Sequence, residues 1–144
     1  MALFNRFEFD NIVAKLNKAK VDLPKLVASD IRNYFVNSFK RQGFDGQKWQ
    51  DVKRREKNNP TAKDKKPILI QTGRLRRSVN ESIRKTSWEE IVLGIDTPYA
   101  KYHNEGTDKI PKRQFMGDSK ELQKTIHNRI EKTIKKIIQT QGKW

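Results

Sequence analysis

Cysteine is absent from the sequence, which excludes disulfide bonds and thiolate metal sites and fits a reducing compartment. The few glycines form no phosphate-binding loop, because Gly94, Gly106 and Gly117 lie too far apart. No apolar run approaches the roughly 20 residues that a membrane span needs. The first residues include Glu8 and Asp10 and no apolar run, so we expect no signal peptide. We therefore expect a protein that acts in a cytoplasm or in a particle assembled there.

Acidic residues are also scarce: 17 Asp and Glu stand against 32 Lys and Arg, for a net charge of +15. The excess is spread almost evenly, with +4, +4, +3 and +4 over residues 1–42, 43–72, 73–117 and 118–144. A nucleic-acid-binding protein more often concentrates its charge on one arm or face. Only residues 53–66, called the basic tract below, are locally dense, with seven basic and two acidic residues. Both a mobile solvated loop and a partner contact fit this tract.

Apolar residues are too few for a large core. They make up 34% of the 144 residues, and the mean hydropathy is -0.94. The length predicts one domain. We therefore expect a thin core, with further surface buried only in an assembly.

Helical spacing of apolar residues occurs near both ends of the chain. Asp10 is a plausible N-cap for a short first helix, and Pro24 restarts the pattern for a second helix that Gly43 closes. The expected stripe of this second helix is Leu26, Val27, Ile31, Tyr34, Phe35 and Phe39. A C-terminal helix over about 118–139 has the stripe Leu122, Ile126, Ile130, Ile134, Ile137 and Ile138.

The middle of the chain predicts a loop and a small sheet. Residues 43–67 form a long irregular segment, whose first half Trp49 pins to the helix while the basic tract stays mobile in the free monomer. Thr72 caps a short helical turn that places Leu75 inward. Residues 78–85 and 90–96 alternate between apolar and polar, which predicts an antiparallel hairpin.

These patterns together predict an α+β fold of a single domain. It comprises N-terminal helices (1–42), the long loop (43–67), a small antiparallel sheet with its connecting loop (68–117) and a long C-terminal helix packed on the sheet (118–144).

Residues 98–117 hold the densest group of backbone-setting and aromatic residues. One helical turn would present Tyr99, Tyr102 and His103 on adjoining faces, and Gly106 would end it with a positive φ. Phe115 then reaches the core. We expect structural roles for Gly106 and Phe115, and leave open whether Tyr102, His103 and Arg113 contact a neighbouring subunit.

Catalysis is not expected from this sequence. His103 and His127 are the only imidazoles, and the acids near His103 (Asp96, Glu105 and Asp108) lack a metal-ligand spacing. We predict no catalytic residue, no cofactor and no metal. The main alternative is a small nucleic-acid-binding protein that contacts phosphates through the basic tract and Arg74 to Arg77, with strongly salt-dependent affinity. A nuclease centred on His103 is a third, weaker hypothesis.

Four short segments in order resemble the phage virion morphogenesis family, the tail-completion proteins of tailed bacteriophages; the layout is also similar to the neck proteins of the related minor-tail group. The resemblance covers about residues 43–138 and begins at Trp49. The family's Thr-Gly-x-Leu-x-x-Ser element falls on Thr72, Gly73, Leu75 and Ser78; Tyr-Ala-x-x-His-x-x-Gly on Tyr99, Ala100, His103, Gly106 and Thr107; and Pro-x-Arg-x-Phe on Pro111, Arg113 and Phe115.

The resemblance implies a structural virion protein without enzymatic activity. Such proteins form a homo-oligomeric ring, commonly a hexamer, that caps the tail tube and receives the head connector; membranes play no part. If basic residues line the ring's lumen, genomic DNA would meet them. The residues we expect to contact subunits or partners are Tyr99, Tyr102, His103, Arg113, Lys53, Arg54, Arg55, Lys63, Lys65 and Lys66.

Overall fold

One long helix organises the computed structural model, which describes residues 6–139. Helix α1 (Arg6–Arg41) is followed by a small hairpin of β1 (Gly43–Phe44) and β2 (Gln47–Lys48) and a 3-10 turn η1 (Lys53–Glu56). Next come α2 (Arg74–Asn80), β3 (Ile83–Thr86), β4 (Ile91–Leu93), α3 (Ala100–Glu105) and α4 (Lys120–Gln139). Helices and two small antiparallel sheets confirm the α+β class. Residues 1–5, on which the signal-peptide expectation partly rests, and 140–144 lie outside the described chain.

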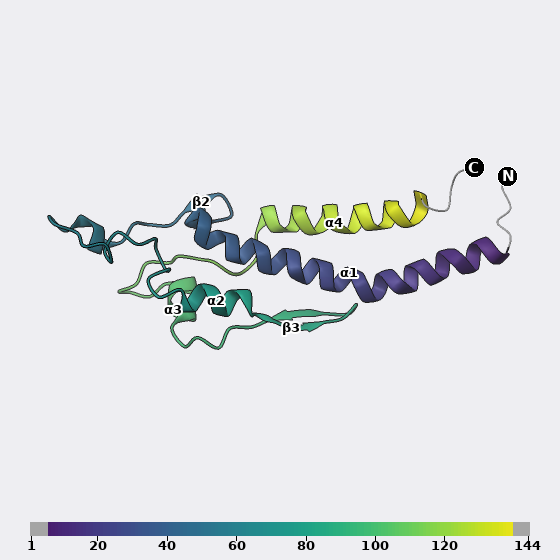
Figure 1. Cartoon of the computed structure of the whole chain (residues 1–144), viewed down its shortest axis with the longest axis horizontal. Helices are drawn as coiled ribbons and strands as arrows, with labels where there is room; N and C mark the ends of the chain where they lie inside the picture. The colour runs from purple at the N-terminus through teal and green to yellow at the C-terminus, as the bar shows by residue number, and fades with distance from the viewer. Residues whose placement is uncertain (1–5, 140–144) are drawn as a thin grey trace.

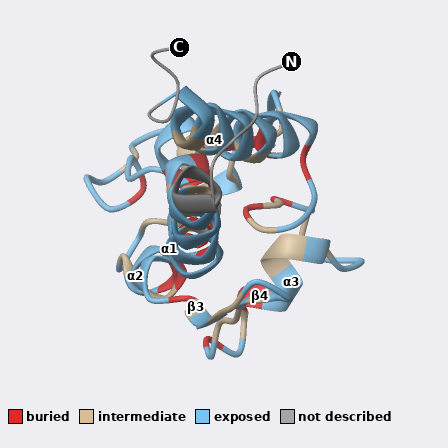
Figure 2. Cartoon of the chain, turned by 90° about the vertical axis from the view of Figure 1, so that its right-hand side faces the viewer, coloured by how far each residue is buried: buried red, intermediate tan, exposed pale blue. Residues whose placement is uncertain are grey.

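The elements form layers on both sides of α1 in an elongated molecule (Figure 1). Helix α4 packs along one side of α1. The other elements that contact α1 include α2, β3 and β4. Figure 2 shows α4 and the β3–β4 hairpin on opposite sides of α1. The expectation that the C-terminal helix packs on the sheet is therefore wrong. The long apolar face of α1 offers α4 more surface to bury than a hairpin of three or four residues per strand does.

The expected pair of N-terminal helices is a single helix, because α1 continues through Pro24. Proline removes one backbone hydrogen bond inside a helix and bends it. Figure 1 shows α1 bending near its middle. Leu23 and Pro24 are both buried, and this burial compensates for the lost bond. The end of the helix also differs: Gln42, with φ 54°, takes the left-handed conformation expected of Gly43.

An aromatic core lies at the C-terminal half of α1, as the stripe of Tyr34, Phe35 and Phe39 predicts. Trp49 packs edge-on against Phe39 with ring centroids 5.7 Å apart, and its indole N–H donates to the Gln114 carbonyl at 2.8 Å. The prediction that Trp49 pins the loop to the helix is confirmed.

The predicted hairpin exists but is shorter than expected. Strands β3 and β4 pair antiparallel with Thr86 opposite Ile91, and a bulge interrupts the register between Ile83 and Lys85. The expected strand residues Ser78 to Asn80 instead belong to α2. Leu75 and Val79 are both buried at helical i, i+4 spacing, and this outweighs the alternation that predicts a strand.

The basic tract is folded on itself, where the sequence suggested a mobile loop. Asp64 is buried and accepts hydrogen bonds from Lys57 Nζ at 2.8 Å and from the Thr61 backbone N–H at 2.9 Å. Arg54 donates to the Lys66 carbonyl at 2.9 Å. The tract projects from the end of the molecule opposite the N-terminal end of α1 and the C-terminal end of α4 (Figure 1).

Candidate interaction site

Helix α3 and its turn present the residues that the sequence singles out. Tyr102 is 53% exposed, whereas His103 on the same turn is half-buried. Gly106 ends the helix with φ 78°, as predicted. A Cβ at this position would lie 2.9 Å from the Lys112 backbone nitrogen, so both the conformation and the space require glycine.

After Gly106 the chain turns and returns beside α3. The Thr107 N–H donates to the Ile110 carbonyl at 2.8 Å, and the Thr107 hydroxyl accepts from the Ile110 N–H at 3.0 Å. This closed turn brings Pro111 and the following extended run back, so that the Arg113 N–H donates to the His103 carbonyl at 2.8 Å. The returning run then delivers Phe115 to the core.

Asn104 holds the returning run in place and was missed by the sequence reasoning. Its side-chain oxygen accepts hydrogen bonds from the backbone N–H groups of Phe115 and Met116, both at 3.0 Å. The only available signal was its residue type, since the side-chain oxygen of an asparagine offers two lone pairs for backbone donors.

The Thr-Gly-x-Leu-x-x-Ser segment builds the start of α2 and joins it to α3. Gly73 is the N-cap with φ 74°, and the Thr72 hydroxyl accepts from the Arg74 N–H at 3.3 Å. Ser78 donates to the Leu75 carbonyl at 2.7 Å and accepts from the Thr97 hydroxyl at 3.0 Å. Thr97 lies just before α3, so this contact fixes α3 against α2.

The separate motifs meet in one cleft of about 270 Å³. Its walls include Thr72 and Leu75 from the α2 segment, Tyr99 and His103 from α3, and Arg113 from the returning run. The basic tract also contributes, through Arg54. The structure therefore brings together three of the segments that carry the family resemblance.

Arg113 lies inside the protein. It is buried, and its guanidinium donates to the carbonyls of Gln50 at 2.8 Å and Asp51 at 3.0 Å. Burial, and then the charge of Arg54, lower the pKa of Arg113. These bonds tie the returning run to the loop after β2, so Arg113 positions the cleft.

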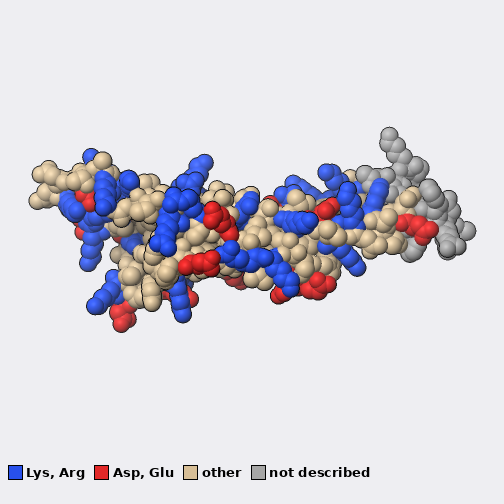
Figure 3. All heavy atoms as spheres, turned by 60° about the horizontal axis from the view of Figure 1, so that its bottom comes forward, with Lys and Arg blue, Asp and Glu red and all other residues tan. Residues whose placement is uncertain are grey.

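The other predicted contact residues divide by exposure. Four lysines of the basic tract are exposed: Lys53, Lys63, Lys65 and Lys66. Arg55 is half-buried and, like Arg54, donates to the carbonyl of Lys66. The charged ends available to a partner are thus mainly those of the lysines. Figure 3 shows basic side chains spread along one whole face of the molecule, as the even charge distribution predicts.

His103 packs against Tyr99, with ring centroids 6.0 Å apart, and its Nδ1 is buried without a hydrogen-bond partner among the described residues. Burial first, and the nearby charge of Arg113 second, lower the pKa of His103 below its ordinary value of 6.5. The imidazole is therefore neutral at neutral pH. Within residues 6–139, no three or more His, Asp or Glu side chains gather to hold a metal ion, and no helix is both long and apolar enough for a membrane span.

This lowered pKa predicts a pH dependence of stability. Because the unfolded chain binds the proton more readily, the free energy of unfolding should fall as the pH drops below 6.5 toward the folded-state pKa. Urea unfolding at a series of pH values would measure it. The His103→Asn variant should lose this part of the pH dependence, and the exposed His127→Asn variant should keep it. Equal profiles for the two variants would contradict the assignment to His103.

Comparison with protein families identifies the chain. The model of the phage virion morphogenesis family matches residues 7–135, most of the 144-residue sequence. The chain belongs to this family. Comparisons with curated proteins and with solved structures found no significant match.

Family membership assigns the protein a structural role in phage virion assembly and associates it with the virion. It favours a structural over a catalytic role. The matched region also extends beyond the segments that carry the resemblance, since it includes nearly all of α1. The long helix is thus part of what the phage virion morphogenesis family specifies.

Proposed function

We propose that this protein is a ring subunit at the head-proximal end of the phage tail, a tail-completion or neck protein that caps the tail tube and joins it to the head connector. Family membership supports the virion-assembly part of this proposal. The proposed part comes from the family resemblance. It comprises the ring, a copy number of about six, and the tail tube and head connector as partners. Assembly would take place in the host cytoplasm.

The large exposed surface of the monomer is the observation that carries the proposal. The chain exposes 10763 Å² of accessible surface, whereas a compact monomer of 17.0 kDa exposes about 7,700 Å². A subunit in a ring has two neighbours, and a standard interface buries about 800 Å² on each partner. The surplus of roughly 3,000 Å² is enough for both neighbours and for contact along the tail axis.

We assign the contact with a neighbouring subunit to Tyr102, together with the exposed lysines of the basic tract. Tyr102 is a large, half-exposed aromatic side chain on α3, which α2 and the returning run hold in place. Such residues often dominate binding energy. Tyr99 and His103 would act mainly by supporting this turn, since both line the cleft beneath it.

Complementation of a phage that lacks this protein tests the proposal. Tyr102→Glu should leave unjoined heads and tails in electron micrographs, while the fold, measured by circular dichroism, is unchanged. Trp88→Glu is the matched control, because Trp88 is a similarly exposed aromatic residue in the turn of the β3–β4 hairpin. Normal virions with Tyr102→Glu, or equal defects with both variants, would reject the assigned contact.

Light scattering with and without a short DNA duplex separates this function from nucleic-acid binding. A ring subunit should form a salt-resistant oligomer, or stay a monomer that ignores DNA at physiological salt. Binding to the duplex that weakens by about 0.9 log units per log unit of salt for each phosphate neutralised would instead support the nucleic-acid-binding alternative.

A further inference from the structure

The apolar faces of α1 and α4 are packed at one end and open at the other. Along α4 the exposed fraction rises from 6% to 37%, 44% and 63% at Leu122, Ile130, Ile134 and Ile138. On α1, Phe35 is buried, whereas Leu26 and Leu16, nearer the N-terminus, are exposed. An apolar stripe that continues past its packed part is a typical docking surface for another element.

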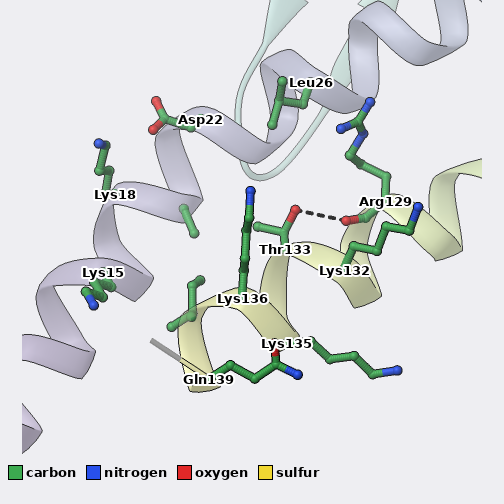
Figure 4. A pocket seen from close by; sticks show the side chains of 12 residues that line it. Lys15, Lys18, Asp22, Leu26, Arg129, Lys132, Thr133, Lys135, Lys136 and Gln139 are labelled. Carbon is green, nitrogen blue, oxygen red and sulfur yellow. Dashed lines mark hydrogen bonds between the residues drawn. The ribbon is translucent and has the colours of Figure 1, made fainter. Parts of the chain in front are cut away.

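A groove of about 750 Å³ lies between the two helices in this region, and of the exposed residues just named Leu26 lines it. Its apolar lining is formed by Ala19 and Leu26 of α1 and Ile137 of α4. Figure 4 shows Lys136 extending from α4 toward α1 across this space. The guanidinium of Arg129, which also lines the groove, donates to both carboxylate oxygens of Asp30 at 2.7 and 2.9 Å, so α4 is tied to α1 at this position.

The groove carries a net positive charge. One acidic residue, Asp22, lines it, and the ion pairs of Arg129 with Asp30 and of Lys135 with Glu131 lie at its edge. Counted as formal charges, the basic residues that line the groove exceed Asp22, Asp30 and Glu131 by three. The six basic residues are Lys15, Lys18, Arg129, Lys132, Lys135 and Lys136.

We propose that this groove binds an acidic amphipathic helix of a partner protein. The apolar side chains of such a helix would cover the lining, and its carboxylates would face the lysines on both rims. DNA would match the charge but not the apolar lining. A second copy of this chain, with net charge +15, would match the lining but not the charge. The groove differs from the proposed subunit contact at Tyr102, so the two proposals can fail separately.

Thiol protection in the full chain tests where such a helix binds. Because the sequence has no cysteine, Ala19→Cys introduces a single thiol in the groove, and Asn58→Cys introduces one in the basic tract. The probe is a synthetic peptide of about 18 residues with leucines at helical spacing and glutamates elsewhere. Bound peptide should slow iodoacetamide alkylation of Ala19→Cys about tenfold at saturation and leave Asn58→Cys unchanged.

Charge-reversed variants test what the groove recognises. Lys18→Glu/Lys132→Glu should weaken peptide binding, measured by fluorescence anisotropy, by about tenfold. Lys53→Glu/Lys63→Glu changes the net charge equally, but on exposed lysines of the basic tract, and should change binding by less than about twofold. A peptide of the same composition in scrambled order should also bind about tenfold more weakly, because it lacks an apolar stripe.

Three results would overturn the proposal. Equal weakening by both charge variants would show general attraction to a basic protein. Protection of Ala19→Cys that grows with protein concentration without peptide would assign the groove to a second copy. Protection that is complete at every concentration without peptide would assign it to another part of the same chain.

Discussion

Phe115→Ala is expected to lower the free energy of unfolding by about 3–5 kcal/mol, the range for a buried phenylalanine replaced by alanine. Phe115 is 1% exposed, and its ring centroid lies 5.4 Å from that of Phe39. Its backbone is also fixed, because its N–H donates to Asn104 and its carbonyl accepts from the Ser38 hydroxyl at 3.2 Å. The surrounding chain therefore has little freedom to close the cavity. Urea denaturation followed by tryptophan fluorescence would measure the loss.

Two further variants show whether the loss comes from the cavity. Phe115→Leu keeps most of the buried volume and should cost about 1–2 kcal/mol. Tyr102→Ala, an aromatic truncation at an exposed site, should change stability by no more than about 0.5 kcal/mol. A loss below about 1 kcal/mol for Phe115→Ala would mean that the returning run is not anchored in the core.

The residues predicted correctly from sequence are those whose role is decided locally. Gly106 follows a short helical turn and needs a positive φ, which glycine adopts most easily. Phe39 and Trp49 are large aromatic residues in a chain with few apolar residues, so burial was the expected outcome. Leu75 is inward in a short helix as the spacing indicates.

The errors concern packing between distant elements. The chain stays helical through Pro24 because burial in the fold compensates for the lost backbone hydrogen bond. The residues near Pro24 in the sequence do not indicate that burial. The apolar stripe of α4 indicates a helix with a buried face but does not name the partner, which is α1. Residues 78–80 fit both the alternation of a strand and the spacing of a helix. They are helical because Val79 is buried in α2.

The candidate site shows the same division. Its residues could be selected from sequence, but their hydrogen-bond partners could not, because Gln50 and Asp51 are more than sixty residues from Arg113. The groove between α1 and α4 was also not predictable. The spacing placed Leu26 and Ile134 in buried stripes, whereas the structure leaves both exposed where the helices part.

Arg113→Ala is expected to destabilise the isolated chain by about 2–4 kcal/mol, because the carbonyls of Gln50 and Asp51 lose a charged donor in a part-buried position. Arg113→Lys keeps the charge, but one ammonium group cannot reproduce the two directed bonds of the guanidinium, so it should recover about half of the loss. Chemical denaturation of the monomer at low protein concentration measures both variants. Phe115→Leu serves as a comparison that alters the same run without touching the Arg113 bonds.

Unchanged stability of Arg113→Ala would indicate that Arg113 acts at an interface and not in the interior. If Arg113→Ala unfolds like the unmodified chain but lowers the oligomer mass in light scattering, its guanidinium must leave Gln50 and Asp51 and reach a neighbour on assembly. Such a switch would require the loop after β2 to open, since the same two bonds close it on the returning run. Loss of monomer stability together with assembly would instead mean that Arg113 acts on the proposed ring only by holding the cleft and α3 in place.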